Sequence, residues 1–227
     1  MLAELYAYAG DRDRAADWFD ASRILAGRIQ SRELFSATLF NMCALRVWES
    51  ALIPRIFGDL KDDLVAADLV FLESSVNYDR MTGVSSRLFL HKLLRAQLLI
   101  AIGQYQKALD LLDSLLSGGD DFGGFESSRI ALERAWCLLE IDEPQTEWAE
   151  VRVSVSNCIF NLIDDDDLAL AHLILSRIGR ITCDAVEVSI GDAATHRYSE
   201  LMCRKRANAK LKLLKSEVVA PEQLLME

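Results

Sequence analysis

Residues 96–112, with the sequence AQLLIAIGQYQKALDLL, decide the fold of this chain. An apolar stretch runs to Ile102, Gly103 interrupts it, and a second stretch follows with apolar residues at helical spacing. Residues 3–19, AELYAYAGDRDRAADWF, repeat this skeleton with the same offsets of three, four, five and four residues. The matched positions are Ala3, Tyr6, Gly10, Ala15 and Phe19 in one segment and Ala96, Leu99, Gly103, Ala108 and Leu112 in the other. The pattern predicts a helix, a tight turn and a second helix folded back on the first.

This pattern resembles the tetratricopeptide repeat (TPR), a helical hairpin that stacks into a solenoid. In such a hairpin small residues lie where the two helices cross, and glycine adopts a left-handed backbone at the turn. The resemblance implies an all-α, TPR-like α-solenoid of about five antiparallel hairpins. We expect the array to be irregular, because the two glycines lie 93 residues apart, which is not a multiple of the roughly 34-residue period. Another helical repeat or an irregular bundle is the alternative.

Composition excludes several classes of protein. Apolar residues make up 51% of the 227 residues and charged residues 26%, which disfavours disorder, and only three prolines interrupt the chain. No apolar run approaches the roughly 20 residues that span a bilayer, and no signal peptide is evident, so we expect no membrane association. The five cysteines are widely spaced, which is typical of buried thiols in a reducing cytoplasm.

The chain divides into four segments. Residues 1–117 are expected to form N-terminal TPR-like hairpins, and residues 125–216 form C-terminal hairpins that end in a basic helix. Residues 118–124, rich in Gly and Asp, are expected to be a flexible loop, and residues 217–227 a tail. The first helix begins with an apolar face and no polar cap, which indicates a fragment of a longer protein or a subunit whose end a partner covers.

Several element boundaries are less regular. We expect Pro54 to end the helix that starts near Arg32, and residues 77–83 to form a loop. Residues 181–190 alternate like a strand, but we interpret them as a short helix because a lone strand would have no partner. The last long helix is expected to begin at Asp192 and end near Lys215.

The resemblance also implies a partner-binding groove lined by the first helix of each hairpin. Two groups of residues would face it: Glu4, Ala7 and Tyr8 in the first copy, and Leu90, Leu93, Gln97, Ile100 and Ala101 in the second. These lack the Lys, Asn and Arg with which co-chaperone repeats hold a carboxylate. An apolar groove would instead accept an amphipathic helix or an extended apolar segment. The alternative is that Leu90, Leu93 and Ile100 are core residues.

The body of the chain is acidic, with net charge −10, whereas residues 197–215 carry seven basic residues and one acidic residue. Candidates to contact an anion or an acidic partner are Arg197, Arg204, Lys205 and Arg206. Stacking aromatics are scarce there, Tyr198 being the only one. We therefore favour a solvated face, or docking on the acidic body, over nucleic-acid binding.

Catalytic signals are weak. His91, His172 and His196 show no metal-ligand spacing, and the glycine-rich segment lacks the lysine of a phosphate-binding loop. Residues 164–167, four consecutive aspartates, lack the alternating ligands and glycine of a calcium loop, and acidic residues commonly begin a helix. We expect no enzyme activity, no cofactor and no metal.

The predicted function is therefore a protein–protein interaction scaffold or adaptor, as a piece or subunit of a larger assembly and with homo- or hetero-oligomers as options. Two alternatives stay open. The chain could be the sensor or oligomerisation region of a larger regulator or signalling enzyme, or a nucleic-acid-associated subunit that uses its basic C-terminal helix.

Overall fold

The structure is a computed structural model that describes residues 2–57, 62–84, 87–117, 123–141 and 146–215, and its elements in these ranges are all helices. This confirms the all-α fold class. The helices are α1 (Leu2–Tyr8), α2 (Arg12–Arg28), α3 (Arg32–Val47), α4 (Ile53–Phe57), α5 (Asp62–Thr82), α6 (Leu88–Ala101), α7 (Tyr105–Ser117), α8 (Gly124–Ile141), α9 (Trp148–Cys158), α10 (Asp165–Ile181) and α11 (Ala185–Lys215). A π-helical turn covers Trp48–Leu52 and a 3₁₀ turn covers Ile159–Asn161. Of the predicted loop at 118–124, residues 118–122 lie outside the described residues, as does the tail at 217–227, and Gly124 already belongs to α8.

The two sequence segments that match each other both form helical hairpins. Gly103 separates α6 from α7 with φ +72°, and Gly10 separates α1 from α2 with φ +80°, a backbone that L side chains rarely adopt. Ala96 and Ala108 are both fully buried on paired helices α6 and α7. Small side chains at these positions let the helix axes approach closely, as the spacing predicts.

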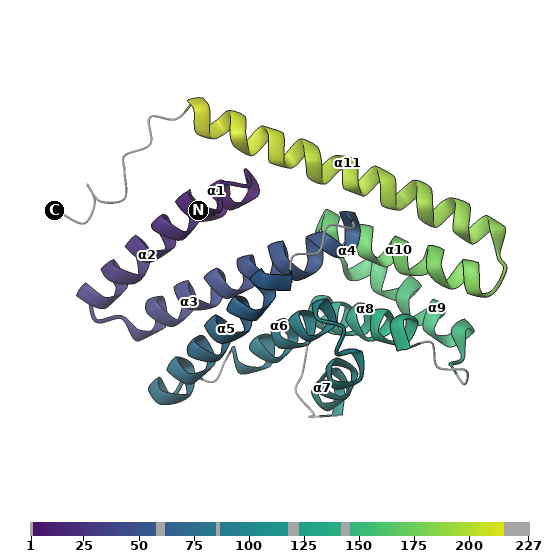
Figure 1. The fold of residues 1–227 in the computed structure, drawn as a ribbon, viewed down its shortest axis with the longest axis horizontal. Coiled ribbons are helices and arrows are strands. Elements are labelled where there is room, and N and C mark those ends of the chain that lie inside the picture. The colour runs from purple at the N-terminus through teal and green to yellow at the C-terminus, as the bar shows by residue number, and fades with distance from the viewer. Residues whose placement is uncertain (1, 58–61, 85–86, 118–122, 142–145, 216–227) are drawn as a thin grey trace.

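Apart from α4, helices that follow one another in the chain also pack against one another, from α1 with α2 through to α10 with α11 (Figure 1). Contacts between α3 and α6, α6 and α8, and α8 and α10 link one pair to the next. Most packed pairs are therefore close in sequence, and the contacts of α4 with α10 and of α1 with α11 are the long-range exceptions. The result is a row of helices with the long α11 running across it.

Three apolar clusters fill this row. The largest joins α6 to α10 around Leu112, Ile130 and Ile174. A second lies between α3, α5 and α6, and a third joins α1 and α2 to Met42 of α3. The largest cluster joins residues of both halves of the chain, such as Leu52 and Leu93 with Ile130 and Ile174.

The predicted helix end at Pro54 is wrong, because the chain stays helical through this residue. Proline lacks an N–H and its ring crowds the carbonyl of Ser50, so a regular α-helix cannot continue there. The π-helical turn Trp48–Leu52 accommodates it: the N–H of Ile53 bonds to the carbonyl of Trp48, five residues back. The turn redirects α4 toward α10, which it contacts.

Two other local predictions need correction. Residues 77–82 belong to α5, which ends only at Gly83 with φ +74°; the hydroxyl of Thr82 bonds to the carbonyl of Tyr78 at 2.8 Å in this last turn. Residues 185–190 are helical, but they open α11 rather than form a separate short helix. The Asp184 side chain accepts a hydrogen bond from the N–H of Glu187 at 3.1 Å, which supports a helix start before Asp192.

The chain's own last helix covers the first one, so the uncovered apolar face expected at the N-terminus is absent. Leu213 of α11 packs on the cluster formed by α1 and α2, and Ala209 is 5% exposed. The guanidinium of Arg206 lies over Gly10, where a Cβ would be 2.9 Å from Nη2. The packing of α11 on α1 therefore supplies the cover that we expected from a partner.

Candidate functional site

A groove of about 440 Å³ lies along α8, between α7 and α9. Ala131 and Ala135, one helical turn apart on α8, line its floor together with Leu138. Leu116 of α7, which is 48% exposed, and Val151 of α9 form apolar parts of its walls. Alanine at the two floor positions leaves space between the flanking helices, and this space is what a partner side chain could fill.

The rim of the groove carries charge. Asp113 of α7 pairs with Arg134 of α8, with 2.8 Å between Oδ1 and Nε, and both side chains are more than two-fifths exposed. Asp110 lies one turn before Asp113 on the same side of α7. Among the described residues that line the groove, Asp113 and Arg134 are the charged ones, so the rim carries one neutralised pair.

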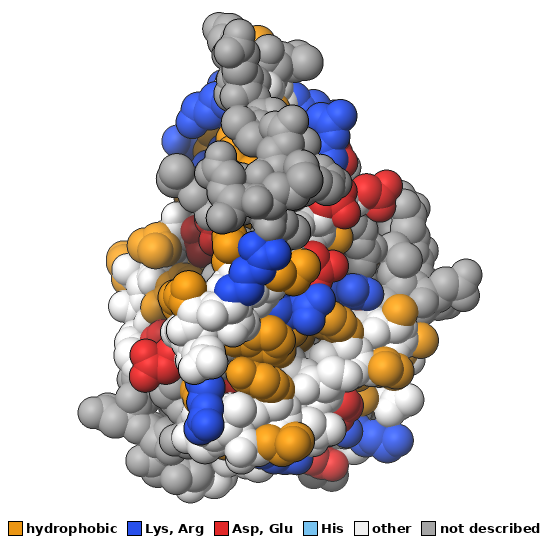
Figure 2. Space-filling model, turned by 90° about the vertical axis from the view of Figure 1, so that its left-hand side faces the viewer, with side chains coloured by type: hydrophobic (Ala, Val, Ile, Leu, Met, Phe, Trp, Pro, Cys, Tyr) orange, Lys and Arg blue, Asp and Glu red, His pale blue; other side chains and the backbone are white. Residues whose placement is uncertain are grey.

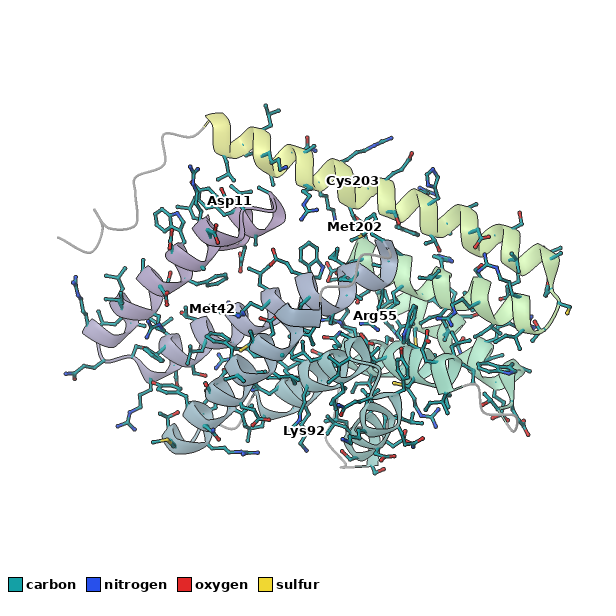
Figure 3. The ribbon with its side chains drawn as sticks, in the orientation of Figure 1. Asp11, Met42, Arg55, Lys92, Met202 and Cys203 are labelled. Atoms are coloured by element: carbon teal, nitrogen blue, oxygen red, sulfur yellow. The ribbon has the colours of Figure 1, made fainter. Side chains whose placement is uncertain are left out.

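The opposite face of α8 is held by a buried polar network. Glu133, 2% exposed, forms a two-pronged ion pair with Arg55 of α4, at 2.5 and 2.9 Å. The amide of Gln97 on α6 donates to Oε1 of the same carboxylate at 2.7 Å. Arg55 lies in the middle of the molecule, where α4 meets α8 and α10 (Figure 3), and its guanidinium faces the Trp136 ring at 5.5 Å. The network fixes the helix that forms the groove floor.

A second buried polar centre lies between α3, α5 and α6. The Nδ1 of His91 donates to the carbonyl of Arg87 at 2.9 Å, since a carbonyl can only accept. Burial lowers the pKa of His91, so its Nε2 accepts a hydrogen bond from the hydroxyl of Ser75 at 3.0 Å. Cys43 also interacts with Ser75, and burial raises the pKa of the Cys43 thiol to about 12. An un-ionised thiol is a poor nucleophile, which argues against cysteine catalysis at this centre.

Asp79 lies beside this centre and is fully buried. Among the described residues, neither of its carboxylate oxygens has a hydrogen-bond partner. Its Oδ2 is 3.9 Å from Nδ1 of His91, and that nitrogen already donates to a backbone carbonyl. The N-terminal core therefore contains a buried acid that its surroundings do not satisfy.

The aspartate run forms a junction of four helical elements. Asp165 pairs with Lys205 of α11 at 2.5 Å, and Asp166 accepts from the indole N–H of Trp48 at 2.6 Å. Asp167 pairs with Arg129 of α8 at 3.4 Å, and burial raises the pKa of Asp167 to about 7 despite that cation. Oxygens of Asp164, Asp166 and Asp167 lie within 4.8 Å of one another, but Trp48 and Arg129 already engage this cluster.

The groove residues expected from the resemblance do not line a common surface. Leu93, Gln97 and Ile100 are 2–3% exposed, which matches the core alternative, and Gln97 serves the network of Glu133. Leu90 is partly buried on α6, whereas Glu4 is exposed on α1. The side chain of Tyr8 lies outside the described part of the chain. The groove described above lies elsewhere, on α7, α8 and α9.

The basic candidates on α11 are all exposed, but their surroundings differ. Lys205 docks on the acidic body through Asp165, and Arg204 lies 3.9 Å from Glu200 of its own helix. Arg206 lies against the turn at Gly10, and Arg197 is exposed one turn before Leu201. The four cations therefore do not form one continuous face, in agreement with the expected solvated or docked helix.

A second apolar surface lies at the turn between α2 and α3. Figure 2 shows hydrophobic side chains gathered at this end of the molecule, with Lys and Arg among them. Ile29 is 65% exposed, Leu34 is 53% exposed, and Ile24 and Leu25 are each more than one-third exposed. Exposed apolar groups in one place commonly mark a contact with another protein.

Sequence reasoning missed the groove, although one signal was present. Ala131, Ala135 and Leu138 follow helical spacing and place small residues on one side of α8. No glycine turn follows α8, so the hairpin it forms with α9 could not be aligned on the two clear repeats.

The chain matches no known family model, no curated protein and no solved structure. No described helix combines the length and the apolar character needed to cross a membrane.

Proposed function

We propose that this chain is a protein-binding scaffold, a TPR-like array of helical hairpins whose partner site is the groove between α7 and α9. The groove itself is the observation that carries the proposal. It has a volume of about 440 Å³, an apolar floor and the charged pair Asp113–Arg134 at its rim.

Two features of the fold support this function. The ion pair between Glu133 and Arg55 holds α8 from behind, so the floor of the groove is rigid, and a rigid site loses less entropy on binding. The chain-order packing of the helices is also what a helical array requires. The apolar surface at the α2–α3 turn offers a second contact for a larger assembly.

A reducing, cytoplasmic location fits the same proposal. All five cysteines are free thiols, and three of them, Cys43, Cys137 and Cys158, are buried. Burial raises the pKa of Cys137 to about 12, as it does for Cys43. A secreted protein of this size would more commonly pair its cysteines.

The test is to fill the groove. Ser154, exposed on the α9 wall, is replaced by tryptophan, and helical peptides are selected from a display library against the unmodified chain. We expect Ser154→Trp to reduce the affinity of the selected peptides at least tenfold, because the indole occupies the partner's space. Isothermal titration calorimetry measures the affinity.

The matched control is Ala149→Trp, at an exposed position of α9 that does not line the groove. It should bind the peptides like the unmodified chain, and circular dichroism should show equal helicity for both variants. A library that yields no peptide sensitive to Ser154→Trp would overturn the proposed function.

A further inference from the structure

Exposed apolar side chains from three helices lie at the end of the molecule that carries the α2–α3 turn. Ile29 and Leu34 are 65% and 53% exposed at this turn. The ring centroid of Phe35, the next residue on α3, lies 4.7 Å from that of Tyr78 on α5. Met81 follows Tyr78 by three residues and is 87% exposed. We call the exposed apolar residues at this end the α2–α3 surface: Ile24, Leu25, Ile29, Leu34 and Met81.

The charges around this surface are mainly basic, although the chain as a whole is acidic. Residues 21–34 contain three arginines and one glutamate, whereas the chain carries a net charge of −10. Arg28 lies in the last turn of α2, Arg32 begins α3, and Arg80 lies in the last turn of α5. All three are exposed, and Figure 2 shows basic side chains between the hydrophobic ones at this end. The α2–α3 surface therefore has basic surroundings.

Helix stability does not account for all of these cations. Arg28 and Arg80 lie near helix C-termini, where the helix dipole favours a positive charge. Arg32 lies at the N-terminus of α3, where the dipole disfavours one. No described residue forms an ion pair with Arg32 or Arg80, whereas Arg23 pairs with Asp20 at 3.1 Å. Arg32 and Arg80 are therefore available to the carboxylates of a partner.

Charge and symmetry disfavour two other occupants of this surface. An anionic membrane is repelled by the net charge of −10 and by Glu33, the exposed carboxylate beside Arg32. A second copy that docked through the same surface would place Arg32 and Arg80 near the same arginines of its partner. Apolar side chains with unpaired arginines beside them instead complement a segment whose apolar side chains are flanked by carboxylates.

We propose that the α2–α3 surface binds an acidic amphipathic segment of another protein. The apolar side chains of that segment contact Ile29, Leu34 and Met81, and its Asp or Glu side chains pair with Arg32 and Arg80. This surface is separate from the groove between α7 and α9, so its test can fail while the proposed function stands.

The experiment is a display library of helical peptides of about 18 residues, with a constant leucine stripe and flanking positions randomised among Lys, Gln and Glu. Binders are selected on the unmodified chain and retested on Ile29→Gln/Leu34→Gln, which removes exposed apolar groups without adding charge. We expect binders that this variant weakens at least tenfold, and we expect them to be enriched in Glu. Sensitive binders with equal Lys and Glu, or enriched in Lys, would overturn the proposal, as would the absence of sensitive binders.

Two controls locate the binding. Circular dichroism should show equal helicity for the unmodified chain and Ile29→Gln/Leu34→Gln, because both positions are exposed. Ser154→Trp, which fills the groove, should leave the affinity of these binders within about twofold. Equal loss in Ser154→Trp would place the peptides in the groove and overturn the assignment to the α2–α3 surface.

Charge reversal adds a quantitative check. Arg32→Glu/Arg80→Glu should weaken a Glu-flanked binder about tenfold or more at low salt, with a smaller loss at high salt. The control Lys107→Glu/Arg204→Glu changes the net charge equally at exposed positions of α7 and α11, and should leave the affinity within about twofold. Equal weakening by both pairs would show a general charge effect and overturn the proposal.

Two measurements on the chain without peptide test the other occupants. We expect sedimentation to show no self-association that Ile29→Gln/Leu34→Gln abolishes, and such association would identify a second copy as the occupant. We also expect no binding to vesicles of phosphatidylserine and phosphatidylcholine. Vesicle binding that the same variant abolishes would assign the surface to a membrane and overturn the proposal.

Discussion

Two buried acids, Glu133 and Asp79, have opposite surroundings in two regions of this molecule. Glu133, in the C-terminal core, is 2% exposed and bonds to Arg55 and Gln97. Asp79, in the N-terminal core, is fully buried, and no described residue bonds to its carboxylate. Burying a carboxylate costs free energy unless it is paired. We therefore expect Glu133 to be tolerated in its core and Asp79 to destabilise the core around it.

This difference also separates the helix that forms the groove floor from the helices around Asp79. The groove floor lies on α8, directly opposite the satisfied acid, while the unsatisfied acid lies between helices that line no described groove. The helix that forms the groove floor is therefore tied to α4 and α6 through Glu133, whereas no described residue ties down the carboxylate of Asp79.

The largest expected effect comes from breaking the ion pair between Glu133 and Arg55. Glu133→Gln removes the charge that pairs with buried Arg55, and we expect a loss of about 3–5 kcal/mol in the free energy of unfolding. Urea denaturation monitored by circular dichroism measures it. Glu140→Gln, which breaks the partly exposed pair with Arg177, is the control, with an expected loss of about 1 kcal/mol or less. Equal losses in the two variants would contradict this expectation.

The second effect is a pH dependence in the C-terminal half. The pKa of Asp167 is raised to about 7 in the folded chain, above its ordinary value of 3.8, so the folded state binds the extra proton between these values. This residue therefore destabilises the fold as pH rises from about 4 to 7, by roughly 2–4 kcal/mol in all.

The measurement compares the unmodified chain with Asp167→Asn at pH 5 and pH 8. The amide variant should lose less stability between these values than the unmodified chain, because the titrating carboxyl is gone. A pH profile of unfolding that is the same in both chains would refute this role.

The third prediction has the opposite sign to the first. Asp79→Asn replaces a buried carboxylate without a described partner by a neutral amide of similar size, and we expect a gain of about 1–3 kcal/mol. The midpoint of urea unfolding measures it, with Asp20→Asn, at an exposed position of α2, as the neutral control. Destabilisation by Asp79→Asn would show that the Asp79 carboxylate has hydrogen-bond partners in solution. The surroundings of Asp79 and Glu133 would then not differ in this respect.

The smallest effects compare glycine positions. Gly191 packs α11 on α10 so closely that a Cβ would be 2.9 Å from the His172 carbonyl, so Gly191→Ala should cost about 1–3 kcal/mol. Gly27 is in α2 with open space around it, and Gly27→Ala should add about 0.5–1 kcal/mol. Thermal unfolding separates the two, and similar shifts would contradict the close approach of α11 to α10 at Gly191.

Local patterns were sufficient for much of the fold. The spacing around Gly103 and Gly10 predicts both hairpins, because apolar periodicity and a left-handed turn act within a few residues of each other. The ends of the helices were harder to predict from the sequence. The π-helical turn before Pro54 depends on packing against α6 and α10, and local proline chemistry alone predicts a break.

The candidate site could be predicted only in part. The acidity of the chain and the spacing of Ala131 and Ala135 are visible in the sequence, but the groove requires α7 and α9 to stand on either side of α8. Leu93, Gln97 and Ile100 were assigned to a surface because the resemblance places first helices at a groove, whereas here their neighbours bury them.

The amino-acid sequence alone determined the helical class, the two glycine-centred hairpins and the basic last helix, since these depend on periodicity, turn geometry and charge along the chain. Tertiary structure alone decided which acids are paired, where the groove lies and that α11 covers α1. These features join residues far apart in sequence, and only the packing of whole helices determines which of them meet.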